Sequence, residues 1–376
     1  MRLASLVLIA ALGGSTPSMA GTGPWRAVRL SSPRGYVERA ALSPDGRWLL
    51  AYGGAEHTSV RAWVMRLADR RWIRGPKALE AAWGPDSRTV ALRDGVLSEP
   101  GVLRTWNVVT GASSRLHQHA TGSPAFSPSG DRVAFIRGGD NALCLLPVTG
   151  AGTRPVVLRW SPWLAAEWAR RKITLDEADL ASWRSPGRVT IRLRLGMSTG
   201  SPEHRLVDID AQTGKVSRLR QMDDDARVPG HGSLEAVTEY KTPLWARFEH
   251  VLPNGRRRSV GLALRGYDYR TAVAAGAPVV VLGMYGEEPG AQQRPLPYTV
   301  WLVDMRNSRS VRLLQTKLHP PGCCCVPAPQ VSLSADGTRI VLCSVSGPQR
   351  LWLLEKSVAP AQGVRATGPS KAFGWP

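Results

Sequence analysis

The sequence repeats one short pattern: an apolar residue, a tight turn and an apolar strand. Four copies are clear, because residues 41–52 read ALSPDGRWLLAY, 82–93 AWGPDSRTVALR, 125–136 AFSPSGDRVAFI and 332–343 SLSADGTRIVLC. The turns begin at Ser43, Gly84, Ser127 and Ser334, so the first two spacings are 41 and 43 residues. A period of about 42 residues made of strands and turns is typical of a β-propeller.

The chemistry of the first copy explains the repeat. Pro44 fixes φ at the second turn position, Asp45 can hydrogen-bond its own backbone, and Gly46 tolerates a positive φ. The strand that follows, residues 49–51, is apolar on both faces, as in a sheet packed between two neighbouring sheets. Because one such sheet cannot bury both faces alone, we expect the sheets to close into a ring.

Counting the outer hairpins predicts an all-β protein, a closed propeller of seven four-stranded blades, with six or eight as alternatives. A fourth inner turn is predicted at residues 183–187, and Asn254-Gly255 predicts a type I′ hairpin. Either the N-terminal stretch PWRAVRLSS or residues 362–367 would complete the last blade. Equivalent, buried inner-strand positions are expected for Leu42, Trp83, Phe126, Trp183 and Leu333.

The Ser-Pro-Asp-Gly turn and the strand after it resemble the repeat of TolB-like propellers. They are also similar to the propeller domains of prolyl-oligopeptidase-type and tricorn-type peptidases. The resemblance covers most of residues 36–356 and implies the β-propeller fold. TolB places an α/β domain before its propeller and the peptidases add a hydrolase domain, whereas here the repeats begin almost at once.

The N-terminal segment MRLASLVLIAALGGSTPSMA has a basic residue, an apolar run and small residues near its end. This pattern predicts a secretory signal peptide over residues 1–20, with one propeller domain over 21–376. We therefore expect a secreted or periplasmic protein. The apolar run is too short to span a bilayer comfortably, so no transmembrane segment is expected after signal removal.

The formal net charge of the chain is +20, and 42 of its 49 basic residues are arginine. A compositional bias of the genome explains this excess of arginine as well as a ligand does. A basic surface still attracts anions. No nucleic-acid-binding module is present, so the expected partner is a protein or a cell-envelope polymer, bound by a monomer.

Each blade has four antiparallel strands, which we call a, b, c and d from the inner strand outward. The connections between them therefore lie alternately at the two ends of the strands. We call the end with the a–b and c–d turns the turn face, and the end with the b–c and d–a loops the loop face. The predicted strands place six of the seven histidines on the loop face, together with Asp223, Asp224 and Asp225. A divalent metal or acid–base site at the channel mouth is one interpretation, and chance gathering in long loops is the other. The candidate ligands are these three aspartates with His117, His119, His231 and His319.

One insertion, RWSPWLAAEWARRK at residues 159–172, has helical spacing and would lie over the same face. Trp163 and Trp168 would form a stacking platform for a sugar or peptide, or would only hold the helix on the ring.

Five cysteines cannot all pair within one chain. In a tight hairpin of the last blade, Cys343 would lie opposite Ala328, three residues from Cys325. The oxidising environment outside the cytoplasm favours disulfides in an exported protein. We therefore predict a disulfide between Cys343 and Cys325, with Cys324 as the alternative partner.

These observations favour a non-enzymatic binding scaffold that acts through the loop face, without a cofactor. No C-x-x-C or H-E-x-x-H motif and no phosphate-binding glycine loop occurs. The alternative is a propeller enzyme, a metal-assisted hydrolase or lyase that uses the histidines at the channel mouth.

Overall fold

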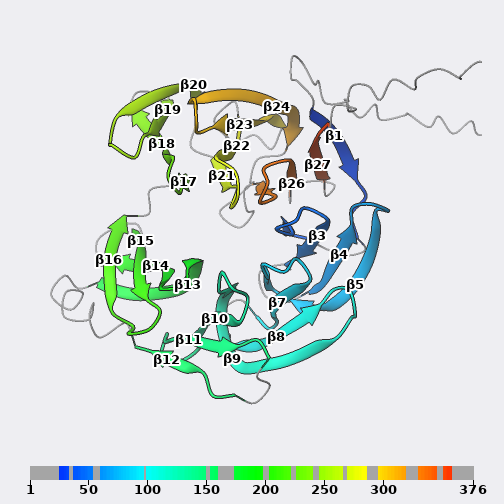
Figure 1. Cartoon of the computed structure of the whole chain (residues 1–376), viewed down its shortest axis with the longest axis vertical. Coiled ribbons are helices and arrows are strands. Elements are labelled where there is room, and N and C mark those ends of the chain that lie inside the picture. Colours follow the sequence, from blue (N-terminus) through cyan, green and yellow to red (C-terminus); the bar gives the residue numbers. More distant parts are fainter. Residues whose placement is uncertain are drawn as a thin grey trace, which may run out of the picture.

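The structure, a computed structural model, describes residues 25–33, 37–53, 60–96, 99–149, 153–159, 173–197, 203–221, 226–239, 245–265, 269–285, 295–318, 329–344 and 350–357. Their regular elements are antiparallel β-strands arranged in a ring of sheets (Figure 1). None of these residues forms a helix of the length and apolarity that a membrane crossing requires.

We number the sheets I to VII around the ring. Sheet I contains β2 (Arg39–Leu42), β3 (Trp48–Tyr52), β4 (Val60–Arg66) and β5 (Arg71–Ala78). Sheet II contains β6 (Glu80–Trp83), β7 (Thr89–Arg93), β8 (Gly101–Asn107) and the first part of β9 (Ser113–Phe126). Sheet III contains the second part of β9, β10 (Arg132–Arg137), β11 (Leu143–Pro147) and β12 (Val156–Leu158).

Sheet IV contains β13 (Ile173–Ser185), β14 (Arg188–Met197), β15 (Glu203–Asp210) and β16 (Val216–Gln221). Sheet V contains β17 (Ala226–Val228), β18 (Gly232–Glu239), β19 (Trp245–Val251) and β20 (Arg257–Arg265). Sheet VI contains β21 (Tyr269–Val273), β22 (Val279–Tyr285), β23 (Leu296–Asp304) and β24 (Arg309–Leu318). Sheet VII contains β25 (Gln330–Leu333), β26 (Arg339–Ser344), β27 (Arg350–Lys356) and β1 (Trp25–Leu30).

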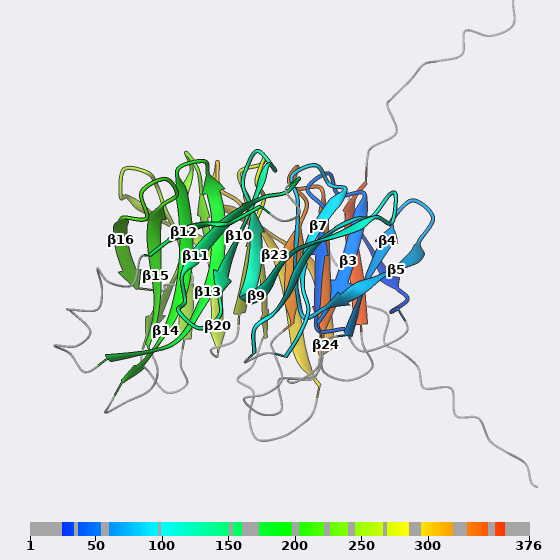
Figure 2. The ribbon, with the colours of Figure 1, turned by 90° about the horizontal axis from the view of Figure 1, so that it is seen from below.

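Strand β9 belongs to two sheets. Its residues 113–120 pair with β8 and its residues 120–126 pair with β10, which joins sheets II and III into one seven-stranded sheet. If β9 is counted once in sheet II and once in sheet III, the described strands form seven groups of four. The first strand of each group lies nearest the centre of the ring, and Figure 2 shows the strands running between the two faces.

Sheet VII is built from both ends of the described chain. Strand β1 pairs antiparallel with β27, from Trp25 opposite Lys356 to Leu30 opposite Leu351. Of the two segments considered for this place, the N-terminal one therefore supplies the outer strand. Sheet VII also packs on sheet I through an apolar cluster that includes Leu30 and Leu49.

The repeat alignment holds at the inner strands. Four of the five marker residues end the first strand of their sheet, and Trp183 lies two residues before the end of β13. Leu42, Phe126 and Trp183 are buried, while Trp83 and Leu333 are half-buried against apolar clusters. A hairpin connects β19 and β20 as expected, but only Gly255 has a positive φ, so the turn is not of type I′.

The core consists of six apolar clusters, each between two neighbouring sheets. They join sheets VII and I, I and II, II and III, III and IV, V and VI, and VI and VII. Inner and middle strands contribute to clusters on both of their faces, because alternate side chains point to opposite sides of a sheet. This double burial explains the continuous apolar runs in the sequence.

The junction between sheets IV and V differs from the other six. No apolar cluster of described buried residues joins these two sheets. The side of sheet IV opposite Ile191 carries the exposed Arg192 and a hydrogen bond of 2.7 Å from Thr190 to Asp208. The side of sheet V opposite Phe248 carries ion pairs from Arg257 to Glu235 and Glu249.

The a–b turns of neighbouring sheets contact each other at four consecutive junctions. Between sheets VI and VII, the amide of Gly276 donates to the carbonyl oxygen of Ala335 (2.8 Å). Between sheets VII and I, the amide of Ala335 donates to the carbonyl oxygen of Pro44 (3.0 Å). The amide of Asp45 donates to the Ser87 hydroxyl (2.9 Å). Between sheets II and III, a Cβ on Gly130 would lie 2.9 Å from the Cγ of Pro85. In sheets IV and V, by contrast, a Cβ on the turn glycines Gly187 or Gly230 would meet no atom within 4 Å.

Replacing Gly130 with alanine should test the energy of these turn contacts. Gly255 is a matched control, because both glycines have φ near +80° (+77° and +81°) and both donate their amide across a turn. Both alanines carry the cost of a left-handed conformation, about 1–2 kcal/mol. Gly130→Ala should lose a further ~1–3 kcal/mol of unfolding free energy in urea, because its Cβ collides with Pro85. Equal losses would show that the close turn contact contributes nothing.

Candidate functional site

His117 and His119 lie within strand β9, near the loop face, and not in a loop as expected. The His117 ring packs against the Phe135 ring in a tilted arrangement, with centroids 4.8 Å apart and an angle of 44° between the planes, and its centroid lies 6.2 Å from that of the His119 ring. Its Nδ1 accepts the amide of His119 at 3.1 Å. Burial, and then the neighbouring charges of His119 and Arg137, lower the pKa of His117. The ring is therefore neutral at physiological pH and one of its nitrogens is already used.

His231 lies on the turn face, which corrects its predicted place. It follows the turn between β17 and β18, which is an a–b connection. Its carbonyl oxygen accepts a hydrogen bond from Nε2 of the fully buried His250 (2.5 Å), whose Nδ1 faces the Ser308 hydroxyl (2.8 Å). The prediction failed because the turn of sheet V, Val-Pro-Gly-His, lacks the Ser-Pro-Asp-Gly pattern. His250 thus joins turns of sheets V and VI, and His231 is not on the face of His117.

The remaining predicted site residues lie outside the described residues. These are Asp223, Asp224, Asp225, His319, Trp163, Trp168 and the insertion at 160–172. Within the described part of the chain, no three His, Cys, Asp or Glu side chains gather in a group able to hold a metal ion. The loop-face site stays a prediction.

The chain contains one G-x-S-x-G string, at residues 196–200, which sequence reasoning passed over. This string marks the nucleophile elbow of α/β-hydrolases, where a strand turns into a helix. Here its first two residues end strand β14, and the next element is the antiparallel strand β15. Ser198 itself lies outside the described residues. The flanking strands are not those of an elbow.

The register of the last hairpin corrects the argument for the disulfide. Cys343 lies opposite Gln330 and not opposite Ala328, a difference of two residues. The cause is the turn: the amide of Ser334 donates to the carbonyl oxygen of Arg339, so the turn is two residues longer than expected. Cys343 is buried and has no disulfide partner among the described residues, and its Sγ lies 3.8 Å from the carbonyl oxygen of Glu38. Cys324 and Cys325 lie outside the described residues. Their pairing with Cys343 stays a prediction without its geometric premise.

A polar network missed by sequence reasoning joins sheets I, II and III near the loop face. The buried Glu80 carboxylate accepts hydrogen bonds from Arg39 and from the Ser123 hydroxyl, the latter at 2.8 Å. All three residues lie four positions before the inner turn of their sheet. Aligning the repeats would have shown this polar layer. The buried Glu80 carboxylate, in sheet II, thus connects sheets I and III.

Two described pockets lie side by side on the turn face. One of about 860 Å³ spans sheets VII, I and II, and one of about 630 Å³ lies beside it on sheet VII. They share Arg339 and Glu355, so we treat them as one surface, the basic groove. Its basic residues are Arg26, Arg47, Arg66, Arg70, Arg88, Arg339 and Lys356, and its acidic residues are Asp45, Asp86, Asp336 and Glu355.

The acidic residues of the basic groove are engaged in the fold. Asp45 accepts the Ser43 hydroxyl at 2.6 Å, and Asp336 accepts the Ser334 hydroxyl at 2.6 Å. Glu355 pairs with Arg339 at 3.1 Å. Partial burial acts to raise the pKa of Asp86, but hydrogen bonds from Arg88 and Thr89 outweigh it and lower that pKa. These carboxylates are therefore held in place by bonds within the fold.

The basic residues of the groove differ in their ion pairs within the fold. Arg66 pairs with Asp69, and Arg47 lies 3.9 Å from Asp45. Four others make no ion pair with a described residue, namely Arg26, Arg70, Arg88 and Lys356. The groove therefore carries more basic than acidic side chains, and sequence reasoning missed it because its residues come from sheets that are distant in the chain.

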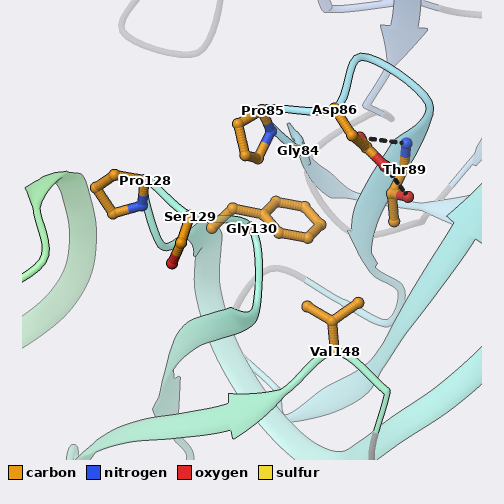
Figure 3. A pocket seen from close by; sticks show the side chains of 9 residues that line it. Gly84, Pro85, Asp86, Thr89, Pro128, Ser129, Gly130 and Val148 are labelled. Carbon is orange, nitrogen blue, oxygen red and sulfur yellow. Dashed lines mark hydrogen bonds between the residues drawn. The ribbon is translucent and has the colours of Figure 1, made fainter.

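A third pocket, of about 350 Å³, lies between the a–b turns of sheets II and III (Figure 3). Pro85 and Pro128 occupy equivalent places in the two turns and line it together with Phe126 and Val148. The Asp86 carboxylate on its edge accepts both the amide and the hydroxyl of Thr89. This turn pocket shares Asp86 with the basic groove.

Comparison with known proteins identifies the fold. No protein-family model and no curated protein matches the chain. Among solved structures, the β-propeller domain of Cps50 (Swd1) from Myceliophteria thermophila has a TM-score of 0.52 at 13% identity, covering 89% of this chain and 100% of that one. An oligogalacturonate lyase in complex with manganese has a TM-score of 0.53 at 14% identity, covering 91% and 96%. TolB from Acinetobacter baumannii gives 0.44 at 12% identity, covering 73% and 65%. The expected all-β propeller is confirmed, and the similarity is one of fold.

The two described cysteines should resist alkylation in the folded protein. Burial raises the pKa of Cys144 to about 11 and that of Cys343 to about 12, so at pH 8 almost no reactive thiolate forms. Iodoacetamide should label both slowly before denaturation and rapidly after it, as measured by peptide mass spectrometry without reductant. Ser114→Cys, at an exposed position, should label rapidly in both states. A Cys343 that stays unlabelled after denaturation would show that it is in a disulfide.

Proposed function

We propose that this β-propeller is a binding protein that holds an anionic partner in the basic groove of its turn face. The observation that carries the proposal is the excess of basic over acidic side chains in the lining of that groove. Charge-assisted hydrogen bonds from arginine are among the strongest polar contacts a protein can offer. Because strands and tight turns of the ring carry these residues, a partner would meet a preformed surface.

Recognition suits the groove better than catalysis does. A general acid or base needs a titratable group that can reach the substrate. The carboxylates of the groove are instead committed to turn hydrogen bonds and to Arg339. A lyase on the same fold shows that the ring can carry chemistry, and an enzyme of that kind here would use the predicted loop-face histidines.

Export is part of the proposal, through a signal peptide at residues 1–20. The partner would then be a cell-envelope polymer or an acidic protein segment outside the cytoplasm. Fractionation of cells that express the full chain, with N-terminal sequencing of the exported form, tests this part. Recovery of the uncleaved chain in the cytoplasm would contradict it.

Removing two free charges of the groove should weaken binding to a polyanion. We expect Arg70→Ala combined with Arg88→Ala to raise the Kd for labelled poly-L-glutamate ~10-fold or more at low salt, because each arginine bond to a charged group contributes about 1.5–3 kcal/mol. The effect should shrink as salt rises. Fluorescence anisotropy measures both.

The matched control is Arg154→Ala with Arg188→Ala, which removes the same charge from exposed sites outside the groove. This variant should change the Kd less than twofold if the groove is the site. Equal weakening by both double variants would mean that only the overall charge attracts the polymer.

A further inference from the structure

The turn pocket between sheets II and III lies at one end of the basic groove. The two surfaces share Asp86, whose carboxylate is occupied by Thr89 (Figure 3). A ligand that lies along the groove therefore reaches the pocket without crossing another sheet junction. Charge recognition and the pocket belong to one continuous face.

One part of the turn pocket is apolar. Pro85 and Pro128 line it from neighbouring turns, together with Val148 and the buried ring of Phe126. The polar side chains of the lining already have partners in the fold, because the Asp86 carboxylate accepts the Thr89 hydroxyl and the Ser129 hydroxyl donates to Asp131. Such walls favour an apolar side chain, because a polar group placed there would lose its hydrogen bonds to water.

The pocket exists at this junction because no side chain fills it. Between sheets VII and I, the Arg339 guanidinium reaches over the turn and donates to the carbonyl of Gly46 (2.6 Å). Between sheets I and II, the Ser87 hydroxyl bonds to the Asp45 amide. In the turn of sheet III, Gly130 occupies the position that Ser87 occupies in the turn of sheet II. Gly130 has no side chain to fill the junction of sheets II and III, and its neighbour there is the ring of Pro85.

We infer that the anionic partner is an acidic peptide segment that places one aliphatic or proline side chain in the turn pocket while its carboxylates lie along the basic groove. This inference rests on the proposed function of the groove. A polymer of acidic sugars matches the charge but has no apolar branch for the pocket, whereas a peptide supplies both. The volume of about 350 Å³ lies at the low end for ligand pockets and suits one such residue with its neighbours.

Two labelled glutamate peptides that differ at one central residue, leucine or glycine, test the inference by fluorescence anisotropy. The wild-type protein should bind the leucine peptide ~10-fold more tightly, because burying an aliphatic side chain contributes about 1.5–3 kcal/mol. Val148→Ala, which removes part of the pocket wall, should clearly reduce this preference. Val148→Thr, which keeps the shape but adds a hydroxyl, should do the same if the side chain is buried there.

Val156 provides a control of the same residue type. It lies in the outer strand β12 of sheet III, is 53% exposed, and lines neither the basic groove nor the turn pocket. Val156→Ala should leave the preference for leucine unchanged. An equal loss of preference with Val156→Ala and Val148→Ala, or no loss with Val148→Ala, would overturn the inference.

The arginine double variant separates this inference from the proposed function. Arg70→Ala with Arg88→Ala should weaken both peptides equally. If both weaken but leucine gives no advantage in the wild type, the groove stands and the peptide assignment fails. If neither weakens, the proposed function itself fails. Unchanged thermal midpoints would show that each variant is folded.

Discussion

The contact between the inner turns of neighbouring sheets organises this molecule. An amide of one turn donates to a carbonyl or hydroxyl of the next, as Ala335 does to Pro44 and Asp45 to Ser87. Such contacts need turns that are small and fixed in shape, which explains why serine, proline, aspartate and glycine recur at the same places. The same turns carry Arg47 and Arg88 on their outer side. Sheet packing and the candidate binding surface therefore depend on the same few residues.

Local chemistry explains how much of the fold the sequence predicts. The turn pattern and the apolar strand after it lie within a dozen residues, so Leu42 and Phe126 could be aligned without knowledge of the ring. The register of the last hairpin could not, because it depends on how many residues the turn takes up. The bond from Ser334 to Arg339 closes a longer turn than a tight hairpin has, and moves the partner of Cys343 by two residues.

The candidate site was harder to predict than the fold. Sorting loops by strand order failed for His231, because the repeat in sheet V has lost its turn pattern. The basic groove is invisible in the sequence for another reason. Arg26, Arg88 and Arg339 lie on one face only because β1, the first described strand, pairs with β27, the last one.

The polar junction between sheets IV and V has a mechanical consequence. Among the described residues, six apolar junctions hold the seven sheets as a continuous arc that starts at sheet V, passes through sheet VII and ends at sheet IV. Such an arc can change its curvature at the remaining junction without bringing apolar surface into water. The first and last described strands, β1 and β27, pair with each other inside this arc. The polar junction thus lies away from the pairing of β1 with β27 and from the basic groove of sheets VII, I and II.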